Sequence, residues 1–424
     1  MIAARLRQSR PAVLVVVAGS AVLAAVVVGL VVLPGDDGGD GPAPPSTGTT
    51  RRAGPYLVPT TIPADCSRPA ENDIMQFLAT VPDGSTVRFP PGGCYAQGTR
   101  IQVFDRHDLV IDGGGSTFRK TSPSIPNGRG PDVHPNWRLA GGSNITLQNL
   151  VIRGVFSTQP NPGNELDHGV SIWGVQTAKV LNATISDVDG DFIDADPDLR
   201  TGCDRARCPV SRDITIDKLR GERASRQGVS FTAVDGAVIS NSFISPGTIT
   251  GTGGNGVDLE TDVDGTILRN VQVVDNEFGA ISFSAVAFVP GSSPEVGNVT
   301  VARNRMSVHP KNCAPGMNLG SPKGTKEGVV ITGNTILTQH DGIRLEGIGG
   351  QVSGNSIVKD GPTTLCQPPV STSVRRIRSS AAVCGNTTRG FPGDTPDPPC
   401  PPAPAPAEAA TTPPDAPTTS SSVK

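Results

Sequence analysis

Short segments in which apolar and polar residues alternate recur along the middle of the chain. Alternation with a period of two is typical of a β-strand that buries one face. The first recurring unit has the form Gly-Val-x-Leu and begins at Gly169, Gly228, Gly256, Ala280, Gly316 and Gly342, and Phe192-Ile-Asp-Ala fits the same positions. The second unit follows the first and ends at Asn182, Asn241, Asn276, Asn304, Asn334 and Asn355. The pattern therefore predicts two or three short strands in each repeat.

The first apolar residue of each Gly-Val-x-Leu unit sets the register of the repeat. These positions are Val170, Ile193, Val229, Val257, Ile281, Met317 and Ile343, at intervals of 23, 36, 28, 24, 36 and 26 residues. One such coil cannot bury its apolar side alone, so successive coils must stack into a solenoid. We predict a parallel β-helix whose recurring Asn residues occupy left-handed turn positions and hydrogen-bond along the stack.

A short amphipathic segment precedes the repeats. Residues 72–78 read Asn-Asp-Ile-Met-Gln-Phe-Leu, with a polar start that is typical of a helix N-terminus. The open end of a solenoid needs a cap. We expect a helix here whose Ile74, Phe77 and Leu78 cover that end.

Two further motifs support a resemblance to a known group. Residues 85–95 read Ser-Thr-Val-Arg-Phe-Pro-Pro-Gly-Gly-Cys-Tyr, and residues 109–118 read Leu-Val-Ile-Asp-Gly-Gly-Gly-Ser-Thr-Phe. Together with the repeats, they resemble the pectin-lyase-like right-handed parallel β-helix superfamily over residues 70–360. That superfamily contains polysaccharide lyases, polygalacturonase-type hydrolases, uronate epimerases and phage tailspikes. The resemblance implies an all-β, right-handed parallel β-helix with saccharide bound along an outer face.

The two ends of the chain differ from the repeats. Residues 11–33 carry no charge and follow Arg5, Arg7 and Arg10, which predicts an uncleaved transmembrane helix with residues 1–10 in the cytoplasm. Residues 34–55 are rich in Gly and Pro and predict a flexible linker. The β-helix domain is expected over 56–390, and residues 391–424 are expected to be a Pro-rich disordered tail. The predicted location is the plasma membrane, with a single span and the domain outside.

Composition narrows the classes of function. The 424 residues include 51 Gly and 40 Pro, and only 4% are aromatic, which suits a turn-rich solenoid with a narrow aliphatic core. The formal net charge of −3 lacks the basic excess of a nucleic-acid binder. Eight cysteines suit an oxidising compartment. Their pairing is open from sequence, although proximity favours Cys66–Cys94 and Cys203–Cys208.

Carboxylates concentrate on the outer face that the register predicts. Asp187, Asp189, Asp191, Asp194, Asp196 and Asp198 fall within 12 residues, and Asp258 and Glu260 recur two coils later. Pairs of carboxyl groups perform glycosidic hydrolysis, and a histidine can move protons near neutral pH. The expected catalytic residues are Asp191, Asp194, Asp258 and His168. Asp191, Asp194 and Asp196 could instead hold Ca²⁺, which prefers such oxygen ligands, or the cluster could be a solvated acidic surface.

Other outward residues are candidates for binding a saccharide. Arginine and amide side chains suit uronate carboxylates and hydroxyls, and an indole ring can stack on a sugar. These candidates are Trp173, Arg226, Gln227, Asn255, Glu260, Arg344 and Glu346. We therefore expect a surface-anchored polysaccharide lyase or glycoside hydrolase that acts on an acidic polysaccharide. A non-catalytic glycan-binding or envelope scaffold β-helix is the alternative, and the sequence leaves the oligomeric state open.

Overall fold

The fold is described from a computed structural model of the chain. The structure describes residues 54–122, 135–156, 166–247, 254–261, 263, 265–290, 296–308, 314–320, 326–361, 372–392 and 397–400. The predicted transmembrane helix, most of the linker and most of the Pro-rich tail lie outside these residues. Among the described helices, none has the length and apolar character needed to cross a bilayer. The domain boundaries therefore stay predictions.

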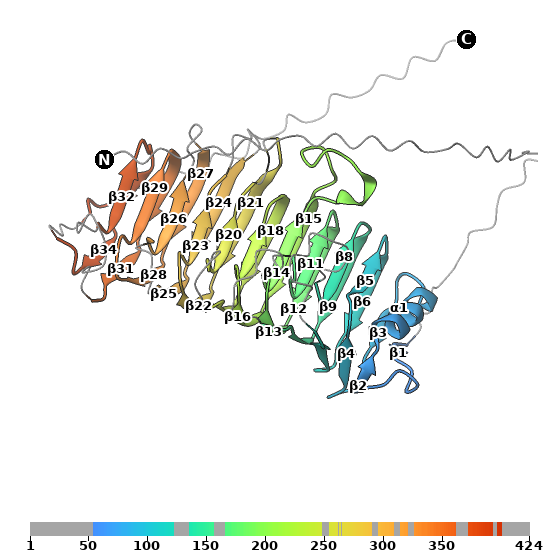
Figure 1. The fold of residues 1–424 in the computed structure, drawn as a ribbon. Coiled ribbons are helices and arrows are strands. Elements are labelled where there is room, and N and C mark those ends of the chain that lie inside the picture. The colour runs from blue at the N-terminus through green and yellow to red at the C-terminus, as the bar shows by residue number, and fades with distance from the viewer. Residues whose placement is uncertain are drawn as a thin grey trace, which may run out of the picture. The chain divides into compact units, whose positions relative to one another are not determined.

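Three parallel sheets, here named A, B and C, run along the folded domain (Figure 1). Sheet A contains β1 Tyr56–Leu57, β3 Thr86–Arg88, β6 His107–Asp112, β9 Ser143–Gln148, β12 Gln176–Leu181, β15 Ser211–Asp217, β18 Val234–Ser240, β21 Leu268–Val274, β24 Val296–Ala302, β27 Lys326–Thr332, β30 Ile348–Ser353 and β33 Ala382–Cys384. Sheet B contains β2 Asp65–Pro69, β4 Cys94–Gln97, β7 Thr117–Lys120, β10 Val151–Arg153, β13 Thr184–Val188, β16 Arg220–Ala224, β19 Phe243–Ser245, β22 Glu277–Ile281, β25 Arg305–Val308, β28 Thr335–Thr338, β31 Ser356–Lys359 and β34 Thr387–Arg389. Sheet C contains β5 Ile101–Phe104, β8 Trp137–Ala140, β11 Val170–Trp173, β14 Ile193–Asp196, β17 Val229–Phe231, β20 Val257–Leu259, β23 Val286–Phe288, β26 Met317–Gly320, β29 Ile343–Glu346 and β32 Val374–Ile377.

Each coil between the first and the last contributes one strand to each sheet, and within the described part of the chain the two terminal coils contribute to sheets A and B only. Three such parallel sheets fit a right-handed parallel β-helix. The Gly-Val-x-Leu unit forms the strands of sheet C, and the second unit forms those of sheet A. The register prediction holds for six of its seven positions, because Val170, Ile193, Val229 and Val257 are consecutive partners and Met317 pairs with Ile343. The first apolar residues of these strands are fully buried.

The prediction for Ile281 is wrong, because Ile281 lies outside this register. It ends β22 in sheet B, and Val286 of β23 is the residue that pairs with both Val257 and Met317. The segment Ala280-Ile-Ser-Phe imitates the repeat because a sheet B strand also alternates apolar and polar residues. The correct segment, Val286-Ala-Phe, lacks the Gly that opens the other units.

Helix α1 (Glu71–Thr80) precedes the regular coils and contacts β4 and β5. It covers the segment for which the sequence predicts a helix. Ile74 and Leu78 are buried and Phe77 packs partly buried against the core. Near this end the core holds Phe89, Tyr95, Phe118 and Trp137 in edge-to-face and stacked contacts, whereas Val, Ile and Leu fill most of the remaining interior.

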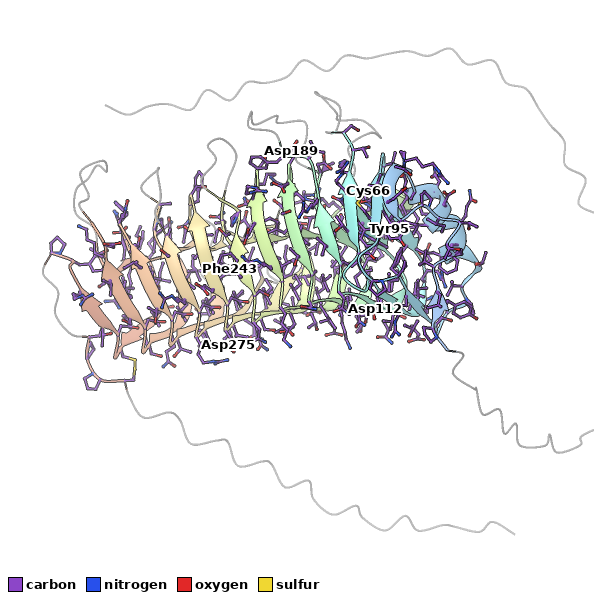
Figure 2. The ribbon with its side chains drawn as sticks, turned by 90° about the horizontal axis from the view of Figure 1, so that it is seen from below. Cys66, Tyr95, Asp112, Asp189, Phe243 and Asp275 are labelled. Atoms are coloured by element: carbon purple, nitrogen blue, oxygen red, sulfur yellow. A yellow bond between two sulfur atoms is a disulfide. The ribbon has the colours of Figure 1, made fainter. Side chains whose placement is uncertain are left out.

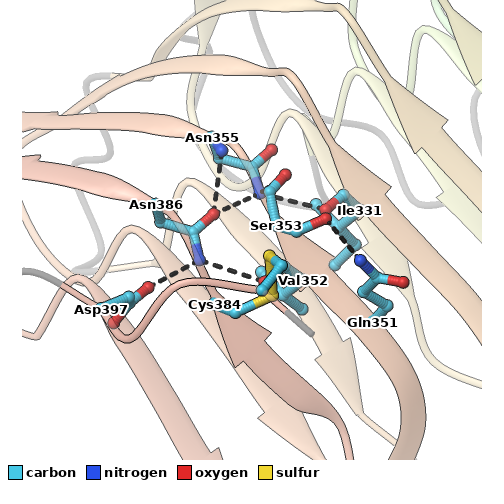
Figure 3. Close-up of a disulfide and its surroundings, with 9 residues drawn as sticks. Ile331, Gln351, Val352, Ser353, Asn355, Cys384, Asn386 and Asp397 are labelled. Atoms are coloured by element: carbon cyan, nitrogen blue, oxygen red, sulfur yellow. Dashed lines mark hydrogen bonds between the residues drawn. A yellow bond between two sulfur atoms is a disulfide. The ribbon is translucent and has the colours of Figure 1, made fainter. Parts of the chain in front are cut away.

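A ladder of buried asparagines links the turns between sheets A and B in the later coils. Asn304 Oδ1 accepts a hydrogen bond from the backbone N–H of Asn276 at 2.9 Å, and Asn334 does the same for Asn304. Asn355 and Asn386 continue the series (Figure 3). The sequence predicts a left-handed backbone at the recurring asparagines. This is confirmed at Asn182 and Asn241, which have positive φ. In the buried ladder the positive φ lies one residue earlier, for example at Asp275 before Asn276.

Disulfides reinforce the fold at three places within the described residues. Cys66–Cys94 and Cys203–Cys208 pair as proximity suggested, and Cys384 pairs with Cys400. The third joins β33 to the segment 397–400, which also contacts Asn386 through Asp397. Figure 3 shows this disulfide beside the asparagine ladder.

Candidate functional site

The acidic residues of the predicted site lie on the outer face of sheet C. Ser171, Asp194, Ser230 and Asp258 are successive partners across β11, β14, β17 and β20. Their neighbours in each strand are buried apolar residues, so these four side chains point outward. Two steps between parallel strands separate the backbones of Asp194 and Asp258 by about 10 Å. Figure 2 labels Asp189 near this site, on the edge opposite to Asp275.

Asp194 and Asp258 face outward but lie in a dry environment, each about 5% exposed. Burial raises the pKa of Asp194 well above its usual range, and the charges of Asp196 and Asp191 add to that effect. Burial also raises the pKa of Asp258 to about 7, assisted by the charge of Glu260. Burial therefore favours the protonated form of both carboxyl groups, and Asp258 exchanges its proton near neutral pH.

His168 connects this column to the turn that precedes β14. Its Nδ1 accepts the backbone N–H of Asp191 at 3.0 Å, which places the ring proton on Nε2. Nε2 lies 3.8 Å from Asp194 Oδ2. Burial, together with the charges of Arg226, Arg138 and Lys120, lowers the pKa of His168 well below its usual range. The ring is therefore neutral and directs its N–H towards Asp194.

The carboxylate of Asp191 accepts a hydrogen bond from the next coil, which fixes its position. Its Oδ1 accepts the backbone N–H of Gln227 at 2.7 Å, and Arg226 Nη1 lies 3.4 Å from Oδ2. Gln227 in turn accepts the backbone N–H groups of Gly254 and Asn255 through its side chain. The catalytic residues predicted from sequence therefore gather at one place, and Arg226 joins them.

The remaining predicted binding residues divide into two groups. The side-chain oxygen of Asn255 accepts the backbone N–H of Ser284, so Gln227 and Asn255 both hydrogen-bond turns of the coil. Glu260 contributes charge beside Asp258. Arg344 and Glu346, which pair with each other at 3.0 Å on β29, lie three strands beyond Asp258 and are not part of the cluster.

A described insertion after β14 folds over the same face. It contains the 3₁₀ turn Leu199–Thr201 and the Cys203–Cys208 disulfide. Arg205 Nη2 bonds Asp196 Oδ1 at 2.5 Å, and Arg200 bonds Asp105 just beyond β5 at 2.8 Å. The insertion is thus anchored to strands on both sides of Trp173.

Two cationic residues near the site carried no sequence signal. Arg138 lies in the column beside Ser171, and its guanidinium stacks on Trp173 with the Cζ atom 3.8 Å from the ring centroid. Burial lowers the pKa of Arg138 to about 10. Burial likewise lowers the pKa of Lys120 to about 7, although it contacts Asp167 beside His168. Both belong to early coils that lack the Gly-Val-x-Leu unit.

The donor set gives limited support to a bound cation. Ligand atoms of His168, Asp191 and Asp194 lie within 4.8 Å of one another. A metal at Nε2 of His168 would have to replace its proton, which would cost the hydrogen bond from Asp191 to Nδ1. Asp196, the third expected Ca²⁺ ligand, is already bound by Arg205 and Thr232. The calcium site stays a prediction.

No protein family matches the chain, and no curated protein sequence is similar to it. Solved structures do share its fold. The surface adhesin PfbA of Streptococcus pneumoniae has a TM-score of 0.53 at 13% identity, over 79% of this chain and 91% of the adhesin. The catalytic domain of Agl-KA has a TM-score of 0.58 at 13% identity, over 80% of this chain and 66% of that one.

A third similar structure comes from a bacteriophage. The tailspike protein of the E. coli bacteriophage HK620, in a double mutant, has a TM-score of 0.58 at 13% identity, over 80% of this chain and 64% of the tailspike. Another double mutant, in complex with a pentasaccharide, has a TM-score of 0.54 at 11% identity, with the same coverage. At such identities the likeness concerns the fold alone. It confirms the fold expected from the repeats: the chain folds as a right-handed parallel β-helix.

Proposed function

We propose that the outer face of sheet C binds a polysaccharide and hydrolyses it, with Asp194 and Asp258 as the acid–base pair. The observation that carries this proposal is the position of two buried carboxyl groups on one outward column, both with raised pKa values. A carboxyl group held protonated at neutral pH is suited to donate a proton to a leaving oxygen. The similar solved structures support a saccharide ligand only indirectly. They share the fold of this chain, and one of them is a tailspike in complex with a pentasaccharide.

The two carboxyl groups have different tasks in this mechanism. Asp194, whose protonated form is favoured by burial and by the neighbouring carboxylates, donates its proton to the glycosidic oxygen. Asp258, which is partly ionised near pH 7, accepts a proton from the attacking water on the opposite side of the sugar. Neutral His168 places its Nε2 3.8 Å from Asp194 Oδ2, beside that carboxyl group. A backbone separation of about 10 Å suits the wider carboxyl spacing of inverting hydrolases, at roughly 6.5–9.5 Å, better than the retaining spacing of about 5 Å.

The substrate that we propose is acidic. The outward column carries Arg138 two strands before Asp194. Beyond Asp258, Arg344 is paired with Glu346, and Arg375 lies 3.6 Å from Asp341. A chain with negative groups would therefore meet attraction at the Arg138 end of the site and a proton donor in the middle. β-Elimination by a lyase would need a base close to the sugar ring proton, and the carboxyl pair favours hydrolysis over that route.

The test measures cleavage by the full chain on a panel of acidic and neutral polysaccharides. Hydrolysis creates reducing ends without an unsaturated product, whereas a lyase creates the ultraviolet-absorbing product. Asp194→Asn and Asp258→Asn should each lower the rate at least about 100-fold. Asp213→Asn, an exposed carboxylate of sheet A, is the matched control and should leave the rate unchanged. Full activity in Asp194→Asn would overturn the assignment.

A binding role without cleavage is the second candidate. It is favoured by the hydrogen bonds that fix Asp191, Gln227 and Asn255 into the turns, because these make part of the cluster structural. One similar structure belongs to a surface adhesin. Tight binding across the polysaccharide panel, with no new reducing ends and no unsaturated product, would select this role.

We also propose that residues 11–33 anchor the protein in the plasma membrane with the β-helix outside. The uncharged run after three arginines supports this arrangement. Protease added to intact cells should remove the β-helix domain, whereas alkaline washing of membranes should leave the chain attached. Release by alkaline washing would exclude the anchor.

A further inference from the structure

The outer face of sheet C holds a buried arginine, Arg138, that pairs directly with no described carboxylate, although Asp194 and Asp196 act on its charge from a distance. Arg138 is only 7% exposed, and within the described residues it makes no hydrogen bond or ion pair; its Nε in particular is buried without a partner. Other arginines around this face are paired with carboxylates, such as Arg205 with Asp196 and Arg226 with Asp191. A desolvated, unpaired guanidinium is costly unless something else binds it.

Two neighbouring donors share this property. Ser171 lies beside Arg138 in the same column, and its hydroxyl is buried without a hydrogen-bond partner in the structure. The indole N–H of Trp173, on which Arg138 stacks, is also buried without a partner. Buried polar groups are normally satisfied. Three such groups on two adjacent strands indicate a site that a ligand completes.

The chemistry of these groups defines what the ligand must offer. A guanidinium and an indole N–H only donate, and a hydroxyl can donate. The complementary ligand presents acceptor oxygens with negative charge, such as a carboxylate or a sulfate. A guanidinium binds such planar or multi-oxygen anions through paired N–H groups.

The position of these residues relates them to the proposed acid. Ser171 is one strand and Arg138 two strands from Asp194, which corresponds to about 5 and 10 Å along the column. We propose that Arg138, supported by Trp173 and Ser171, forms a subsite for an anionic group on the sugar that lies before the bond cleaved at Asp194. This inference rests on the proposed polysaccharide function and adds the residues that select charge on this side of the site.

The test measures binding separately from cleavage. The full chain carrying Asp194→Asn is titrated with three matched oligosaccharides: an oligouronate, its carboxyl-reduced neutral form and a sulfated form of the neutral one. We expect at least one anionic form to bind about 10-fold or more tightly than the neutral form. Adding Arg138→Gln should remove most of that preference and leave affinity for the neutral oligosaccharide within about 2-fold.

Four controls keep the result interpretable. Arg138→Lys keeps the charge but not the paired N–H groups and should restore the preference only in part. Arg220→Gln, on sheet B and already paired with Glu222, should leave the preference intact. The thermal midpoint of each variant shows whether it folds, and Ser171→Ala provides a milder change at the same subsite.

The outcomes separate this inference from the proposed function. Equal binding of charged and neutral oligosaccharides, or a charge preference that survives Arg138→Gln in a folded protein, overturns the subsite. A preference that depends on Arg138 supports it, even when the wild-type protein cleaves none of the oligosaccharides. Cleavage that depends on Asp194, without any effect of Arg138 on charge preference, retains the proposed function and rejects the subsite.

Discussion

Asp258→Asn is expected to stabilise the protein at neutral pH while removing the proposed base. The side chain is 5% exposed, and its pKa rises from 3.8 to about 7 on burial beside Glu260 and Asp191. The folded protein therefore keeps a proton that the unfolded chain releases. Stability is fully present below about pH 4 and declines as the pH rises towards 7, because over that interval the folded state binds more protons.

The size of the effect follows from the pKa difference. A rise of about 3 units corresponds to about 4 kcal/mol between the two limits. Asparagine preserves the shape of the side chain without the charge, so this pH-dependent loss should disappear. The thermal midpoint of Asp258→Asn should match that of the wild type near pH 4 and exceed it by several degrees near pH 7.5.

The assay follows thermal midpoints of both proteins by calorimetry between pH 4 and 8. Midpoints are preferable to extrapolated free energies, because stacked coils need not unfold in a single step. Asp275→Asn is a control of opposite sign, since Arg303 lowers the pKa of the exposed Asp275 carboxyl group and its loss should remove stability at neutral pH. Parallel curves for Asp258→Asn and the wild type would refute the assigned burial cost.

Asn304→Ala should cost about 3 kcal/mol and lower the thermal midpoint, because it leaves buried backbone groups of two coils without partners. A midpoint lowered no more than that of Asn72→Ala, at an exposed position of α1, would show that the ladder is unimportant. Ile74→Asp should reduce folding stability by about 4 kcal/mol, because it places a charge in the fully buried contact of α1 with the first coils. An unchanged thermal midpoint would show that the packing of α1 does not stabilise this end of the β-helix. Arg205→Gln should speed hydrogen exchange in residues 199–208 without changing it in β14, because it removes the bond that holds the insertion to Asp196. Equal exchange of residues 199–208 in this variant and in the wild type would exclude the anchoring role.

Much of the fold could be read from the sequence because a solenoid repeats its local rules. Each Gly-Val-x-Leu unit has the same apolar face to bury against the same neighbours, so Val170, Ile193, Val229 and Val257 align by pattern alone. The failure at Ile281 has the same origin. All three sheets alternate apolar and polar residues, and a segment from sheet B can imitate sheet C when the true strand lacks the opening Gly.

The candidate site was predictable only where it coincides with the repeat. Asp194 and Asp258 occupy one position of the unit, so their common column follows from the register. Arg138 and Lys120 belong to early coils without a recognisable unit, and their proximity to the carboxylates depends on stacking across many residues. Burial is also invisible in sequence, because an outward residue of a sheet is exposed unless another segment covers it.

The stability cost and the proposed chemistry have one physical origin. Water exclusion over sheet C raises the pKa values of Asp194 and Asp258, which destabilises the folded chain at neutral pH and keeps a carboxyl group protonated for acid catalysis. The same burial leaves the Nε of Arg138 without a hydrogen-bond partner among the described residues. An anionic ligand on this face would bring negative charge to Arg138, whereas negative charge placed beside Asp258 would raise its pKa further. The ligand must therefore position its charge nearer to Arg138 than to the carboxyl pair, and cleavage should prefer substrates whose anionic group lies on that side.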